Sequence, residues 1–201
     1  MTDAGPLLVA DALSLERGGR QLFSELSLSV HAGELIQVQG ANGAGKTSLM
    51  RILAGLSRYG FDGEVTRSAG LLYLGHQSGV KGLLSPRENL AWHVAGAEQS
   101  SDAEIEGALH EVGLYGFEDV PSHTLSAGQH RRVNLARLYL STSPLWILDE
   151  PFTAIDAEGV ANLESLLKTH LERGGAVILS SHQTLNISYR VQMLSLREGL
   201  L

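Results

Sequence analysis

Apolar and polar positions along the chain predict a series of short strands joined by turns and capped helices. In residues 22–30, Leu26, Leu28 and Val30 alternate with polar residues, as in a half-buried strand. Residues 145–148 and 176–179 are instead continuous apolar runs, which are typical of buried parallel strands. The complete set of strand-like segments is 7–15, 22–30, 35–39, 63–66, 71–74, 145–148 and 176–179. We therefore expect an α/β fold with a mainly parallel core and an antiparallel N-terminal β subdomain.

Helix-start signals concentrate in the middle of the chain. Ser85 and Ser101 each precede a Glu by three residues, the pattern of a capping box, and Gly113 is a plausible stop for the second helix. The first predicted helix begins after residue 45 and ends near residue 55. Further helices are predicted over residues 86–95, from 102 to the stop at 113, over 126–140 and over 157–173. Residues 78–141 are thus a helical insertion, and residues 1–77 and 142–201 form the core of the same single domain.

Composition limits the classes of function. A chain of 201 residues, 43% of them hydrophobic, suits one domain better than two. A formal net charge of -7 argues against nucleic-acid binding, which relies on clustered Lys and Arg. The lack of cysteine excludes disulfides and thiolate metal sites. The N-terminus has no basic signal-peptide region, and no run reaches the roughly 20 apolar residues of a membrane helix. We expect a soluble protein that needs a partner chain for any membrane role.

A glycine-rich segment joins the strand at 35–39 to the helix after it. Its pattern is G-x-x-x-x-G-K-[ST], formed by Gly40, Ala41, Asn42, Gly43, Ala44, Gly45, Lys46 and Thr47. The glycines let backbone N–H groups converge on phosphates, Lys46 would reach the β and γ phosphates, and Thr47 would bind Mg²⁺. Ser48 is a further expected nucleotide contact. The strand before and the helix after disfavour the alternative of a chance glycine-rich turn, so we expect ATP and Mg²⁺ as cofactors.

Two adjacent carboxylates, Asp149 and Glu150, end the apolar run at 145–148. Such a pair is costly next to a buried strand unless a cation is present. Asp149 would hold Mg²⁺ through water, and Glu150 would orient and polarise the attacking water. The alternative is a strand exit with solvated acids. Together with the phosphate loop, the pair favours a nucleoside triphosphatase.

The segment Leu125-Ser126-Ala127-Gly128-Gln129 begins a helix with Ser126 as N-cap, so that free N–H groups and a hydroxyl face an anion. A capped surface helix would explain these residues equally well. However, LSAGQ followed by HRRVNLARL and then by a strand that ends in Asp-Glu resembles the signature motif of ABC-type ATPases, usually LSGGQ. The resemblance implies that Ser126, Gly128 and Gln129 contact nucleotide.

Further residues match the same family in order. Gln77 matches the glutamine that senses Mg²⁺ and the attacking water, Asp156 the D-loop aspartate, and His182 the switch histidine at the γ-phosphate. Without the resemblance they would be a loop amide, a helix cap and a structural histidine. The family often stacks an aromatic on adenine where this chain has Arg17, whose guanidinium could lie on the base instead. A solvated turn is the alternative.

Within the family, LGHQSGVKGLLSPRENL, SPLWILDEPFTAID and SSHQTL resemble the ATP-binding subunits of the haem exporter of bacterial cytochrome c maturation. This resemblance implies a peripheral protein on the cytoplasmic face of the inner membrane, with integral-membrane partners of the CcmB and CcmC type. It also implies that ATP hydrolysis by this subunit is linked to release of the haem-loaded chaperone CcmE. The eight histidines show no convincing haem-ligand arrangement, so we expect no direct haem binding.

One chain has one phosphate loop and one signature, so two complete ATP sites require a head-to-tail homodimer. Three alternatives stay open. The chain could serve an ABC transporter of another compound, because ATP-site residues do not encode cargo. It could be a soluble ABC ATPase, although these usually have coiled-coil insertions or two ATP domains. It could be a P-loop kinase, which has no use for LSAGQ.

Overall fold

The computed structural model of the chain describes residues 5–92 and 100–196. They form two compact units. The first unit contains residues 5–76, 143–151 and 164–196, and the second contains residues 77–92, 100–142 and 152–163. Each unit has its own cluster of buried apolar side chains.

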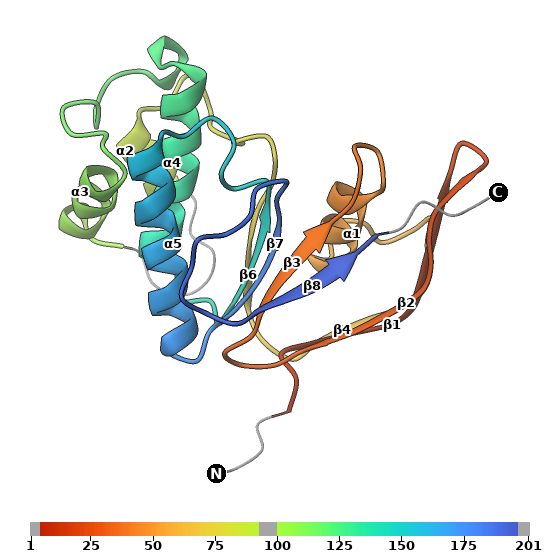
Figure 1. The fold of residues 1–201 in the computed structure, drawn as a ribbon. Helices are drawn as coiled ribbons and strands as arrows, with labels where there is room; N and C mark the ends of the chain where they lie inside the picture. The colour runs from red at the N-terminus through yellow and green to blue at the C-terminus, as the bar shows by residue number, and fades with distance from the viewer. Residues whose placement is uncertain (1–4, 93–99, 197–201) are drawn as a thin grey trace. The chain divides into compact units, whose positions relative to one another are not determined.

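A parallel sheet of five strands is the centre of the first unit (Figure 1). The strands lie in the order β5 (Leu71–Leu74), β6 (Leu145–Asp149), β7 (Ala176–Ser180), β3 (Leu35–Gln39) and β8 (Val191–Ser195). All residues of β6 and β7 are buried, as the continuous apolar runs predict. The carboxyl ends of β3, β6 and β7 carry the phosphate loop, the two acids and the switch segment. In open α/β sheets this edge is where ligands bind.

A second, antiparallel sheet belongs to the same unit. It consists of β2 (Arg20–Val30), β1 (Leu8–Arg17) and β4 (Asp62–Arg67), in that order. The pairing of β1 with β2 shifts register at several points, and Ala12 and Glu25 have positive φ there. This sheet is the predicted antiparallel N-terminal subdomain.

Helix α1 (Lys46–Leu53) follows β3 and packs against β6. It buries Leu49, Met50, Ile52 and Leu53 in the same cluster as Ile147 of β6. Each fully buried aliphatic side chain contributes about 1.5–3 kcal/mol, so this cluster fixes the helix firmly behind the phosphate loop. The chain also contains α5 (Ala157–Glu172), which Asp156 caps through a bond from Gly159 N–H to its Oδ1 at 2.9 Å.

The second unit packs three helices on one another: α2 (Pro86–Trp92), α3 (Asp102–Glu111) and α4 (Ala127–Leu140), with a 3-10 turn η1 (Ser122–Thr124) before α4. Capping boxes are present at Ser85, Ser101 and Ser126. Gly113 follows the C-cap residue Val112 of α3 and has φ 70°, a left-handed conformation that fits its predicted role as the stop of this helix. The predicted end of the first of these helices, at residue 95, lies outside the described residues.

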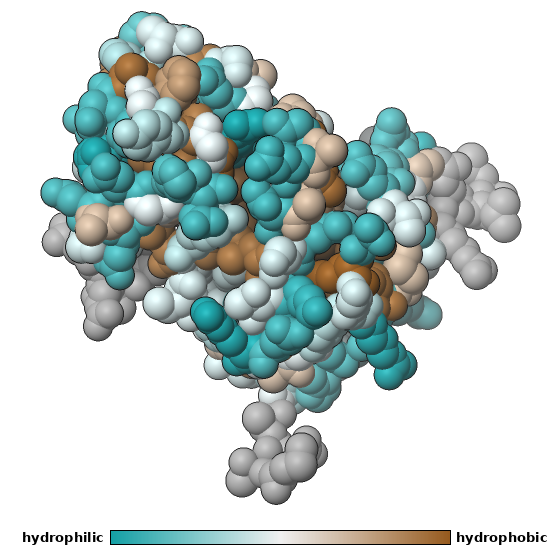
Figure 2. All heavy atoms as spheres, turned by 60° about the vertical axis from the view of Figure 1, so that its left-hand side comes forward, coloured by the Kyte–Doolittle hydropathy of each residue, from teal (hydrophilic) through white to brown (hydrophobic). Residues whose placement is uncertain are grey.

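The sequence analysis did not identify β8, because Gln192 interrupts the apolar residues of Val191–Ser195 and most of this strand is exposed. Most surface residues in Figure 2 are hydrophilic, and hydrophobic residues reach the surface in small areas.

Of the helices within residues 5–92 and 100–196, none has the length and apolar character needed to cross a membrane.

Candidate active site

The phosphate loop requires glycine at two positions for different reasons. Gly43 has φ 82° and open space around it, so only its backbone conformation excludes other residues. Gly45 has φ 96°, and a Cβ there would lie 3.1 Å from Cβ of Leu22. Ala41, Asn42 and Gly43 are exposed. The loop therefore presents backbone to solvent immediately before the first turn of α1, an arrangement that suits an anion.

Lys46 folds over this loop. Its Nζ donates to the carbonyl of Gly40 at 2.8 Å and to that of Ala41 at 3.2 Å. The residue is only 8% exposed. A nearly buried ammonium held by backbone carbonyls still favours an anion beside it. This is the chemistry that a triphosphate would supply.

Asp149 and Glu150 stand at the end of β6, in different environments. Asp149 is fully buried, and its Oδ1 accepts a hydrogen bond from the hydroxyl of Ser180 at 2.8 Å. Glu150 is partly exposed and has φ 51°, a left-handed conformation that is strained for a residue with a side chain. Its N–H donates to the same Ser180 hydroxyl at 2.9 Å. The buried acid and the strained acid are thus tied to one oxygen atom.

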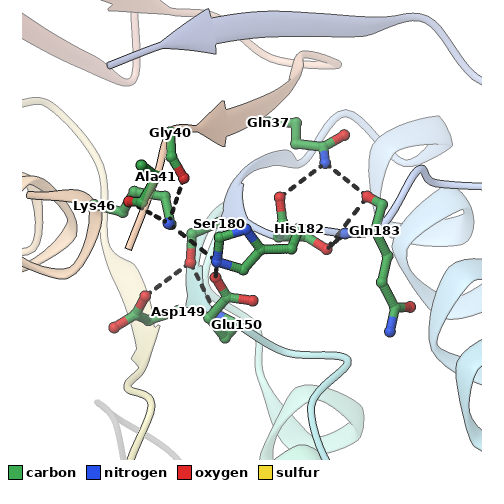
Figure 3. A network of polar contacts seen from close by, with 10 residues as sticks. Gln37, Gly40, Ala41, Lys46, Asp149, Glu150, Ser180, His182 and Gln183 are labelled. Atoms are coloured by element: carbon green, nitrogen blue, oxygen red, sulfur yellow. Dashed lines mark hydrogen bonds and ion pairs between the residues drawn. The ribbon is translucent and has the colours of Figure 1, made fainter. Parts of the chain in front are cut away.

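His182 lies between Lys46 and Glu150 (Figure 3). Its Nε2 is 3.2 Å from Nζ of Lys46 and 3.4 Å from Oε1 of Glu150. An ammonium can only donate and an ionised carboxylate can only accept. Nε2 therefore either accepts from Lys46 while it is unprotonated or donates to Glu150 while it is protonated. The histidine can exchange partners without leaving the site.

Gln37 fixes the segment that carries His182, and the sequence analysis did not identify it. Its Nε2 donates to the carbonyls of Ser181 and Gln183, at 3.3 and 2.9 Å. Figure 3 shows the amide of Gln37 directed at the chain that carries His182 and Gln183. A glutamine in the middle of the predicted strand 35–39 was the available sequence signal, and in the structure this residue is 2% exposed.

Electrostatic effects at the sheet edge reach Tyr73 of β5. Burial raises the pKa of its hydroxyl to about 12, and the nearby charge of Asp149 adds to the shift.

The oxygen donors of Thr47 and Asp149 are of the kind that Mg²⁺ prefers. Across the two described stretches of chain, no group of three or more His, Cys, Asp and Glu forms a metal site.

The signature segment belongs to the second unit. Ser126 is exposed, and its hydroxyl accepts from Gln129 N–H at 3.2 Å, while Gln129 Oε1 accepts from Ser126 N–H at 2.9 Å. A Cβ on Gly128 would lie 3.3 Å from the carbonyl of Ala154. The start of α4 is therefore accessible to another molecule, and the helix start lies against the D-loop segment.

Asp156 is exposed and bonds to Arg132 of α4, with 2.6 Å between Oδ2 and Nη2. The bond from Gly159 N–H and the charge of Arg132 lower the pKa of its carboxyl. Asp156 therefore caps the start of α5 and also bonds to a side chain of α4, which is more than the single helix cap expected from sequence.

Two remaining candidates, Gln77 and Arg17, are exposed. Gln77 lies at the start of the second unit, after β5. Arg17 ends β1 and pairs with Arg20 across a turn formed by Gly18 and Gly19, both with positive φ. Neither of the two has a contact that assigns its role.

Comparison with known proteins gives one consistent result. Residues 23–153 match the profile of the ABC transporter family. The chain is similar to proteins named cytochrome c biogenesis ATP-binding export protein CcmA. The relative from Hahella chejuensis is 49% identical, with 98% of each chain covered. The relative from Saccharophagus degradans is 51% identical, with 88% of this chain and 87% of the relative covered.

Two solved structures share the fold. A dimeric, post-hydrolysis ATP-binding cassette bound to ADP and Pi superimposes with a TM-score of 0.76, at 22% identity and with 88% of each chain covered. An ATP-binding subunit of an ABC transporter gives 0.77 at 22% identity, covering 88% of this chain and 79% of that one. Both confirm the predicted fold class.

Proposed function

Because the chain belongs to the ABC transporter family and, within it, to the family of cytochrome c biogenesis ATP-binding export proteins, we propose that its ATP hydrolysis powers an export step in cytochrome c maturation. The enzyme is an ABC-type ATPase. The cytochrome role is supported by relatives at about half identity over most of the chain, whose names state that function. The ATP site is supported by the contacts that bring Lys46, Glu150 and His182 together.

Each residue of this site has a proposed task. The loop from Gly40 to Thr47, with Ser48, would hold the phosphates of ATP, and Lys46 would bind the β and γ phosphates. Glu150 would act as the base that orients and polarises water. His182, 3.2 Å from the Lys46 ammonium, would contact the same γ-phosphate.

Mg²⁺ would be held by Thr47 and Asp149, with Gln77 sensing it. When bound, Mg²⁺ neutralises charge on the phosphates. The chain's own residues then hold the nucleotide and activate water. The complete burial of Asp149 and its hydrogen bond from Ser180 keep its carboxylate in one orientation, which supports a role as ligand rather than as base.

We further propose that two copies form a head-to-tail dimer around two ATP molecules. Ser126, Gly128 and Gln129 would complete the site of the partner copy, with Asp156 nearby. Exposure of the Ser126 cap supports this, because its helix start has N–H groups available to an anion. Loss of the γ-phosphate would remove contacts shared by the two copies and allow the dimer to open.

The export complex would place this chain at the cytoplasmic face of the bacterial inner membrane, against integral-membrane subunits of the CcmB and CcmC type. Residues 77–90 are the proposed contact segment. Within it, Leu83 is 89% exposed, which is unusual for a leucine and fits an apolar contact with a partner. We assign no haem ligand to this chain, and hydrolysis would serve release of the haem-loaded chaperone CcmE.

For the base of ATP, Arg17 is the proposed contact in place of an aromatic residue. Its exposed position at the β1–β2 turn, within the unit that carries the phosphate loop, supports this. If Arg17→Ala leaves the affinity for ATP unchanged, the base is bound in another way.

Gene deletion and complementation test the cytochrome role. The deletion strain should lose all c-type cytochromes, detected by haem staining, and the wild-type gene should restore them. Lys46→Ala should fail to restore them, whereas Lys168→Ala, which alters only an exposed pair with Glu172, should succeed. Normal cytochromes in the deletion strain would indicate an ABC ATPase that serves another compound.

A further inference from the structure

Ser180 has no assigned task in the site, yet it contacts both acids at the end of β6. It is the last residue of β7 and is completely buried. The parallel pairing of β6 with β7 sets Asp149 directly beside Ser180. Residues paired in this way direct their side chains to the same face of the sheet, so the hydroxyl reaches the carboxylate.

The two hydrogen bonds of Ser180 have fixed directions. A serine hydroxyl has one proton to donate. An ionised carboxylate can only accept, so this proton goes to Oδ1 of Asp149 at 2.8 Å. The N–H of Glu150 can only donate, so it uses a lone pair of the same oxygen, at 2.9 Å. Neither bond can be made by alanine or by an apolar side chain.

The bond to Glu150 also accounts for the local backbone. After β6 the chain leaves the sheet, and the N–H of Glu150 bonds to a side chain instead of a strand carbonyl. Glu150 then adopts φ 51°, which persists only where surrounding contacts enforce it. The hydrogen bond from its N–H to Ser180 of the neighbouring strand β7 is one such contact. The carboxylate is thereby aimed at His182, 3.4 Å away.

We propose that Ser180 is a positioning residue of the ATPase site, whose hydroxyl holds the metal-binding carboxylate of Asp149 and the catalytic backbone of Glu150 in one fixed relation. This inference rests on the proposed roles of Asp149 and Glu150. Ser180 touches neither nucleotide nor water in this role; it acts through the two acids.

The test is steady-state ATP hydrolysis by Ser180→Ala, with Ser180→Thr as the variant that restores the hydroxyl. Removing a residue that orients a metal ligand typically lowers activity about 10- to 100-fold. We expect a kcat lower by about that factor with KM for ATP nearly unchanged, because the phosphate loop is not altered. Ser180→Thr should recover most of kcat. An unchanged kcat in Ser180→Ala would overturn the proposal.

A double-mutant cycle with Glu150→Gln separates positioning from general damage. If Ser180 acts through the Glu150 carboxylate, Ser180→Ala should lower the residual turnover of Glu150→Gln, followed with radiolabelled ATP, much less than it lowers wild-type turnover. Equal factors in both backgrounds would show that Ser180 does not act through the Glu150 carboxylate and would overturn the proposal. Wild-type turnover in Glu150→Gln alone would instead refute the assignment of Glu150, and not that of Ser180.

Ser122→Ala is the matched control for loss of a buried hydroxyl. Ser122 is also completely buried, and its Oγ accepts from Nδ2 of Asn89 at 3.2 Å within the second unit. It should lower the melting temperature and leave kcat near the wild-type value. If Ser180→Ala is too unstable to assay, the ratio of kcat between Ser180→Thr and Ser180→Cys serves instead. Equal kcat in these two variants would also overturn the proposal, since a thiol is a poor substitute for the hydroxyl.

Discussion

Glu150→Gln should separate ATP binding from ATP hydrolysis in this protein. The substitution keeps the shape of the side chain and changes only its charge and its capacity to take a proton. The backbone N–H that bonds to Ser180 at 2.9 Å is retained, and so is the left-handed conformation at this residue. The contacts of Lys46 with Gly40 and Ala41 do not involve Glu150. Nothing that holds the nucleotide is removed.

Two magnitudes decide the expected result. A general base typically contributes 10²- to 10⁴-fold to the rate, which corresponds to about 2.7–5.4 kcal/mol in the barrier. Folding should change far less, because the neighbouring His182 side chain is 52% exposed and such pairs contribute about 0–1 kcal/mol. Turnover should therefore fall by at least two orders of magnitude while the protein stays folded.

The assay combines phosphate release, ATP affinity by calorimetry, and molecular mass in solution with ATP and Mg²⁺. We expect wild-type affinity, little phosphate release and accumulation of a dimer. Glu172→Gln is the matched control, because Glu172 is exposed and forms a surface ion pair with Lys168 at 3.7 Å. A monomer with unimpaired turnover would refute both the role of Glu150 and the dimer.

Three further predictions concern stability. Ser101→Ala removes a capping box that includes Glu104 and should cost about 1 kcal/mol in urea unfolding, with turnover unchanged. Gly175→Ala should lower the melting temperature, because a Cβ there would overlap the ring of His170, which lies stacked on Trp146 at 3.7 Å between centroids. Burial lowers the pKa of His170, so the unfolded state binds more protons below about pH 6.5, and the free energy of unfolding should fall as the pH drops from about 7.5 to 5.5. His170→Phe should weaken this pH dependence. An equal slope of unfolding free energy against pH in both proteins would contradict it.

Local signals in the sequence were sufficient for most of the fold. The predicted boxes at Ser85 and Ser101 each lie within four consecutive residues, and the structure confirms both, together with the predicted N-cap at Ser126. The buried strands β6 and β7 were equally visible, since an apolar run needs no partner to be recognised. In contrast, β8 has no such run and becomes a strand only by pairing with β3. Its formation depends on tertiary context.

The site was predictable as a set of residues but not as a geometry. Motifs identified Lys46, Glu150 and His182, which are separated by up to 136 positions, and the structure brings their polar atoms within 3.2–3.4 Å. Ser180 and Gln37 were not identified. Their contacts depend on which strands are neighbours and in which register, and no short segment carries that information.

The register of β7 against its neighbours therefore determines more than the packing of the sheet. A shift by one residue would turn Ser180 to the opposite face, away from Asp149. The buried carboxylate would then lose a donor, and the strained backbone at Glu150 would lose the acceptor of its N–H. Both losses oppose the shift, so the polar contacts of the site and the apolar contacts of the sheet select the same register. The hydrogen bonds that Ser180 makes to the two acids of the ATPase site therefore help to specify the register of the sheet.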